Sequence, residues 1–142
     1  MTRIERDTKG TIKFGTMRER FSKAYPSIAE KAYEFRKMNN DELLVRLNDG
    51  TCLLYNELDY TYITLPKSRS SMTDDDYKQE FAYCLKRAML RQEINQKELA
   101  EQSGISQGNI SEYLSAKHLP NYIHICKLAN AFHCSIADFR YR

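Results

Sequence analysis

A run of small and amide side chains in the C-terminal part of the chain is suited to hydrogen bonding with nucleobases. Gln107 and Asn109 are separated by Gly108, and Ser106 and Ser111 flank them. A side-chain amide can bond N6 and N7 of adenine together in the DNA major groove. Gly108 would allow close approach of the backbone, and the serines are candidate contacts to the DNA backbone. We therefore expect this run to read bases, with Gln107 as the first choice.

Further residues could complete a DNA-binding surface. Glu112, one turn further along, could accept a bond from cytosine N4 or orient Gln107, and it could equally be a solvent-exposed residue that avoids DNA. Gln96 lies where a helix should begin, and the helix dipole would help its amide to bond a phosphate. Lys117 and His118 follow in a predicted loop and are candidate phosphate contacts.

Local signals place these residues on two short helices joined by a tight turn. Asn95, with Glu98 three residues later, forms a capping-box pattern that predicts the start of the first helix. Gly104 provides the positive φ that ends this helix. Ser106 can cap a second helix over residues 107–115, where apolar residues recur at helical spacing. The leading polar residues of the second helix would then project outward.

Apolar anchors, caps and the turn glycine occur in a specific order: Gln96-Lys97-Glu98-Leu99-Ala100, Ser103-Gly104-Ile105-Ser106, Ile110-Ser111, Lys117 and Pro120. This order resembles the helix-turn-helix of the phage repressor and Cro family, of the xenobiotic-response-element type. The resemblance extends from about Phe81 to Phe139. It implies a five-helix, lambda-repressor-like domain that binds double-stranded DNA. The family often has Glu-x-Gly after the second helix, whereas here Ala116 takes the glycine position and lacks the ease of glycine at positive φ.

Caps also predict the other helices of this domain. Thr73 caps a helix that runs to about Arg91, and Asn121 caps a helix with an apolar stripe. Ser135 caps a last short helix, with Asp138 at the capping-box position.

The N-terminal part of the chain is expected to combine helices with strands, so the fold class is α+β. Met17 and Phe21 share one face of a first helix. A second helix is predicted from about Ser27 to Met38, because Ile28, Ala32 and Phe35 repeat at helical spacing. Apolar runs at 42–47, 51–56 and 60–65, separated by turn residues, predict a three-stranded antiparallel meander that packs on this second helix.

The domains expected from these patterns are a flexible basic arm at 1–15, a helix plus β-meander domain at 16–66, a linker at 67–73 and a helix-turn-helix domain at 74–142. A loosely ordered end is the favoured interpretation of the arm. It could instead reach DNA, or add a short strand at residues 11–14.

Three tyrosines of the predicted meander, Tyr55, Tyr60 and Tyr62, have two possible roles. They could stack on bases or contact phosphates, but we favour cross-strand packing or a protein interface.

Composition excludes several classes of protein. No apolar run approaches the roughly 20 residues of a membrane helix, and the N-terminus has no secretory signal, so we expect a cytoplasmic protein without a membrane partner. Residues 71–142 carry equal numbers of basic and acidic residues, which argues against a strongly basic, non-specific binder.

No metal or cofactor is expected from the sequence. Four residues, His124, Cys126, His133 and Cys134, lie close together in the chain, but their spacing fits no zinc motif. The cysteines, which also include Cys52 and Cys84, are expected to be free and packed.

We expect a sequence-specific transcriptional regulator, a repressor that binds a two-fold operator as a homodimer through the helix Gln107–Ser115. The alternative is an antitoxin whose N-terminal domain binds a toxin protein. An enzyme is not expected, because residues 1–70 contain no histidine and the chain has no Gly-rich phosphate loop or nucleophile motif.

Overall fold

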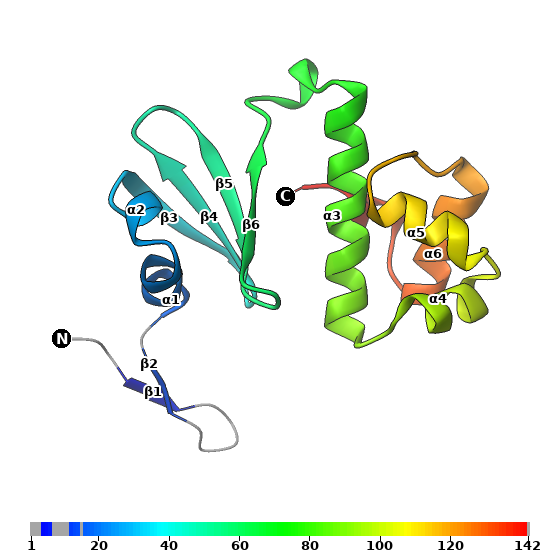
Figure 1. Ribbon diagram of the computed structural model, residues 1–142, viewed down its shortest axis with the longest axis horizontal. Helices are drawn as coiled ribbons and strands as arrows, with labels where there is room; N and C mark the ends of the chain where they lie inside the picture. The colour runs from blue at the N-terminus through cyan, green and yellow to red at the C-terminus, as the bar shows by residue number, and fades with distance from the viewer. Residues whose placement is uncertain (1–3, 7–11, 15, 142) are drawn as a thin grey trace. The chain divides into compact units, whose positions relative to one another are not determined.

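The computed structural model describes residues 4–6, 12–14 and 16–141, and the chain divides into two compact units, Met1–Lys67 and Ser68–Arg142 (Figure 1). In the first unit, Ile4–Arg6 (β1) and Ile12–Phe14 (β2) pair as an antiparallel two-stranded sheet. The strand considered for residues 11–14 therefore exists as β2. The rest of the expected flexible basic arm lies outside the described residues.

Two short helices and a four-stranded antiparallel sheet form the rest of the first unit, with both helices on one side of the sheet (Figure 1). The helices are Met17–Ala24 (α1) and Pro26–Ala29 (α2). The strands, in the same order in space and in the chain, are Ala32–Asn39 (β3), Glu42–Leu47 (β4), Cys52–Asn56 (β5) and Thr61–Leu65 (β6).

The predicted helix from Ser27 to Met38 and the three-stranded meander are both wrong. Helix α2 ends at Ala29, and residues 32–39 form the additional strand β3. The reason lies in β4, whose residues are nearly all buried, so that it needs a paired neighbour along each edge. Pairing with β4 outweighs the local helical signal of the segment before it.

A β-bulge explains why the apolar residues of β3 have helical spacing in the sequence. Ala32 pairs with Leu47 and Glu34 pairs with Arg46, so β3 has one extra residue at this point. The bulge brings Ala32 and Phe35 onto the same core-facing side of the sheet, three residues apart. This spacing also fits one face of a helix, and the sequence alone does not distinguish the two.

Aromatic side chains dominate the core of the first unit. Phe21 and Tyr55 are both fully buried and their rings lie 5.1 Å apart, with Tyr25 between Phe21 and Tyr62. Tyr55 pairs with Tyr62 across β5 and β6, so these two tyrosines have the packing role favoured above. Tyr60 differs, because its side chain is 63% exposed and its φ is +59°.

The second unit is helical between residues 69 and 139. It consists of a short 3₁₀ helix at Arg69–Ser71 (η1), the α-helices Asp74–Gln92 (α3), Gln96–Ser103 (α4), Gln107–Leu114 (α5) and Tyr122–Phe132 (α6), and a second 3₁₀ helix at Ile136–Phe139 (η2). None of the helices in the described residues combines the length and hydrophobicity needed to span a lipid bilayer.

The expected five-helix layout needs correction at its last element. Ser135 and Asp138 do form the expected capping box, but the segment they begin is a four-residue 3₁₀ helix rather than an α-helix. So few residues before the chain extends at Arg140 leave little room for α-helical bonds, and short terminal turns commonly tighten to 3₁₀ geometry. Phe139 still fills its expected place in the core beside Phe81 and Phe132.

A buried carboxylate ties both ends of the second unit to α3. Glu80 is 3% exposed and accepts two hydrogen bonds from the guanidinium of Arg69, at 2.6 and 3.0 Å. The same carboxylate accepts the backbone N–H of Tyr141 at 2.8 Å. These charge-assisted bonds satisfy a charge that would be costly to bury alone.

Candidate nucleic-acid interface

Helix α4 and the turn after it are built by the residues that the sequence indicated. Asn95 Oδ1 accepts the backbone N–H of Glu98 at 2.8 Å, and Glu98 Oε1 accepts that of Asn95 at 3.1 Å, which completes the expected capping box. Gly104 ends the helix with a φ of +75°, and its N–H donates to the carbonyl of Ala100. Ile105 is 3% exposed and holds the turn against the core.

Helix α5 begins at Gln107, with Ser106 as its cap. The Ser106 hydroxyl accepts the backbone N–H of Asn109 at 3.2 Å and so caps the helix as expected. Ile110 and Tyr113 are buried on the core side. The opposite face of the leading turn carries exposed residues, namely Ser106, Gln107, Gly108, Asn109 and Ser111. We call this set the α5 amide face.

The protein itself gives no packing reason for the glycine in this face. A Cβ atom placed on Gly108 would meet nothing within 4 Å, and Gly108 has ordinary helical rather than positive φ. Packing and backbone conformation in the described residues would therefore both tolerate a side chain here. The space beyond Gly108 is open for an external molecule to approach the backbone.

Glu112 is paired with a residue that the sequence did not connect to it. Its carboxylate Oε2 lies 3.1 Å from Nε2 of His118, and both side chains are substantially exposed, at 46% and 65%. From the sequence, His118 was predicted only as a candidate phosphate contact. The link is made possible by the exit of α5, where the Lys117 N–H donates to the Glu112 carbonyl and brings the loop back over the helix.

The exit of α5 contains a residue other than glycine with positive φ. Ala116 has a φ of +60°, in the left-handed region that disfavours residues with a Cβ. The chain thus turns at the position where the resemblance places glycine, and Lys117 follows it, exposed to solvent.

The remaining expected residues lie on the first helix of the pair and behind the second. Gln96 is the first residue of α4 and is only partly exposed.

Behind α5, the Tyr113 hydroxyl lies 2.6 Å from Nδ1 of His124 and so links α5 to α6. Burial raises the pKa of Tyr113. His124 is therefore engaged in packing, and within residues 4–6, 12–14 and 16–141 no group of three potential ligands could hold a metal ion.

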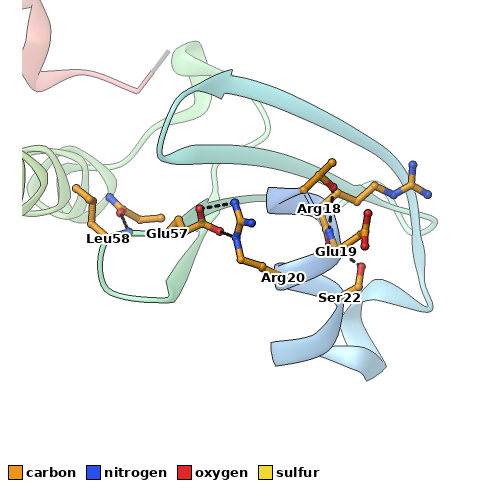
Figure 2. A network of polar contacts seen from close by, with 8 residues as sticks. Arg18, Glu19, Arg20, Ser22, Glu57 and Leu58 are labelled. Carbon is orange, nitrogen blue, oxygen red and sulfur yellow. Dashed lines mark hydrogen bonds and ion pairs between the residues drawn. The ribbon is translucent and has the colours of Figure 1, made fainter. Parts of the chain in front are cut away.

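The first unit contains a polar hollow that the sequence did not indicate. It has a volume of ≈ 900 Å³ and lies beside α1 and the turns that follow β3 and β5. Arg20 of α1 binds Glu57 of the second turn through two hydrogen bonds, at 2.6 and 2.9 Å (Figure 2). The Glu57 N–H in turn donates to the Asp41 carbonyl. These bonds fix the hollow's walls, and Arg18, Lys23 and Tyr60 also line it.

Comparisons with known proteins found similarity over part of the chain. Two of the solved structures that match part of the chain are described here. A transcriptional regulator described as HTH_3 family from Vibrio cholerae shares 21% identity over 47% of this chain, with a TM-score of 0.46. This chain covers only 38% of that protein. The restriction-modification controller protein C.AhdI from Aeromonas hydrophila shares 19% identity over 44% of this chain and 94% of its own, with a TM-score of 0.43.

No curated protein gave a significant sequence match. The family model described as "Helix-turn-helix" matches residues 85–139, which include α4, the glycine turn, α5 and α6. Residues 85–139 of this chain therefore form a helix-turn-helix domain.

Proposed function

We propose that this protein is a sequence-specific DNA-binding regulator of transcription, of the phage repressor and Cro type, that represses its target in the cytoplasm. The observation that carries the proposal is the α5 amide face, which is exposed at the start of a helix whose other side is buried. Exposed amides on the leading turn of a recognition helix can bond the base edges of the major groove. The match of residues 85–139 to the helix-turn-helix family supports the same function.

Each residue of the interface then has a specific task. Gln107 bonds N6 and N7 of adenine, and Asn109 either does the same on a neighbouring base pair or holds a phosphate. Gly108 lets the backbone of α5 approach the groove. Gln96, at the start of α4, bonds a phosphate with the help of the helix dipole.

The other contacts of the proposed interface are to the DNA backbone. Ser106, Ser111 and Lys117 are exposed around α5 and bond phosphates. Glu112 does not read bases in this proposal, because its carboxylate is paired with His118.

The regulator acts as a homodimer on a two-fold operator. One recognition helix reads only a few base pairs, and useful specificity normally comes from two half-sites about one helical turn (~34 Å) apart. Each half-site would receive one α5 helix.

The experiment that tests the function is selection of bound sequences from random double-stranded DNA with the full-length protein. We expect enrichment of a palindrome with two identical half-sites. Recovery of unenriched DNA, or of no DNA, would contradict the proposal.

Substitution of one amide then tests the assigned helix. Gln107→Ala should weaken binding to the selected site by about 1–3 kcal/mol and relax the preference at one base pair. Gln102→Ala is the matched control, because Gln102 is an exposed glutamine on α4 outside the α5 amide face. Equal losses on the selected site and on random DNA would show that Gln107 does not read sequence.

A further inference from the structure

Within the described residues of the first unit, β6 is an edge strand of the four-stranded sheet. The Leu47 N–H donates to the Thr51 carbonyl, so the backbone groups of residue 47 point from β4 toward β5. Backbone direction alternates along paired antiparallel strands, and the β4–β5 and β5–β6 registers are continuous. Following this alternation, residues 61, 63 and 65 point toward β5, whereas Tyr62 and Thr64 point outward. Among the described residues, no strand lies beyond β6.

Within Thr61–Leu65, this edge has neither the charges nor the bulges that usually prevent strands from pairing between molecules. Its sequence, Thr-Tyr-Ile-Thr-Leu, contains no charged residue, and its register with β5 has no bulge. Natural sheets normally protect an exposed edge with charges, bulges or proline. An unprotected edge is therefore a surface that fits another extended strand.

The opposite edge of the same sheet, strand β3, is protected by bulges and by charges. Strand β3 has two register shifts, between Ala32 and Glu34 and between Lys37 and Asn39. It also carries Arg36 and Lys37, which would meet a like charge if two β3 strands paired about a two-fold axis at or between these residues. Like charges directly opposite each other destabilise a strand pair. The contrast between the two edges selects β6.

The residues at the ends of β6 determine one register for pairing with a second copy. An antiparallel pair centred on Ile63 places Tyr62 of each copy opposite Thr64 of the other. The backbone N–H and C=O groups of both outward-pointing residues then form hydrogen bonds between the two copies. A pair centred on Tyr62 would instead place Thr64 opposite Tyr60, which has left-handed backbone. A pair centred on Thr64 would place Tyr62 opposite Pro66, which has no N–H.

We propose that two copies of this protein associate through β6, antiparallel and centred on Ile63, into one continuous sheet of four strands from each copy. The inference rests on the proposed function in one respect, since it supplies the dimer that a two-fold operator requires. The occupant is a second copy because the uncharged strand is complementary to itself in donors, acceptors and side chains. Five residues give a short interface, so we expect a weak dimer that assembles at micromolar concentrations.

Proline variants of the full-length protein test the edge by analytical ultracentrifugation without DNA. Thr64→Pro removes an outward N–H in each copy and leaves the bonds to β5 intact, so the dissociation constant of the dimer should rise about tenfold or more. Lys37→Pro is the matched control, because the same alternation makes Lys37 an outward-pointing, exposed residue on β3. A wild-type protein that stays monomeric, or equal effects of both variants, would overturn the proposal.

A cysteine variant gives a second readout if Thr64→Pro does not fold. The Cα atoms of a non-hydrogen-bonded antiparallel pair lie about 4.5 Å apart, within the range for a disulfide. Ile63→Cys should therefore form a covalent dimer under mild oxidation, with a 63–63 link identified by mass spectrometry. The unsubstituted protein, with its four native cysteines, and Arg36→Cys on β3 should not. Absence of the 63–63 link would show that β6 does not pair in this register.

The two proposals can fail separately. Loss of self-association with intact binding to a single half-site would leave the DNA-binding function and remove the β6 interface. A dimer that forms through β6 but binds all DNA sequences equally would support the β6 interface and contradict the proposed sequence-specific function.

Discussion

The carboxylate of Glu112 on α5 lies 3.1 Å from Nε2 of His118 in the loop that follows. This pairing holds a negative charge beside the α5 amide face, where DNA phosphates are expected to approach. The imidazole partners this carboxylate, which reduces repulsion of a polyanion.

Removal of the histidine should therefore weaken DNA binding. His118→Ala leaves Glu112 without this partner, and we expect affinity for the selected site to fall by up to about fivefold, the scale of an exposed ion pair. Fluorescence anisotropy with labelled duplex measures the change. The double variant Glu112→Gln, His118→Ala should recover the loss, and a double variant as weak as His118→Ala would show that the histidine contacts DNA directly.

Gly108 provides a test that separates folding from DNA binding. Gly108→Ala should leave the free energy of unfolding unchanged or slightly higher, because a Cβ meets no neighbour and alanine favours helix. Gly108→Leu should remain folded but bind the selected DNA at least about tenfold more weakly, since the side chain occupies the approach to the backbone. Thermal unfolding and anisotropy measure the two effects. Normal binding by Gly108→Leu would show that this turn does not enter the groove.

Replacement of Ala116 by glycine should stabilise the protein. Its φ of +60° costs a residue with a Cβ about 1–2 kcal/mol, and glycine loses part of that gain to backbone entropy. Ala116→Gly should therefore raise the free energy of unfolding by about 0.5–1 kcal/mol in urea titration. Gly104→Ala, at a φ of +75°, is the reverse experiment and should lower it. A destabilising Ala116→Gly would mean that α5 ends elsewhere.

Tyr55 should affect stability at high pH. Its hydroxyl is buried without a hydrogen-bond partner among the described residues, and burial raises its pKa to about 12. The unfolded chain releases this proton near its ordinary pKa of 10, so stability is fully present below pH 10 and is lost as pH rises through 12. Tyr55→Phe should therefore reduce the loss of stability between pH 10 and 12.

The same substitution should be harmless at neutral pH. Removal of an unpaired buried hydroxyl is expected to leave stability unchanged or raise it by about 1 kcal/mol. Urea titrations at pH 7 and at several alkaline values test both points. A large loss at pH 7 would indicate that the hydroxyl has a partner.

Local signals in the sequence predicted the helix-turn-helix well. The caps of α4, α5 and α6, the turn at Gly104 and the strands β4 to β6 all lie within a residue or so of their expected places. The caps and the turn depend on contacts between residues a few positions apart, such as Asn95 with Glu98. Residue types at fixed spacing are sufficient to specify such contacts.

The sequence by itself therefore determined the order of the helices in the helix-turn-helix domain and the identity of their outward residues. Only the tertiary structure decided that residues 32–39 are a strand, that Glu112 faces His118, and that Glu80 holds Arg69 and Tyr141. The physical reason is that these features depend on partners brought together by the folded chain. Local spacing cannot show that β4 needs a neighbour on each edge, nor which strands form the two edges of the completed sheet.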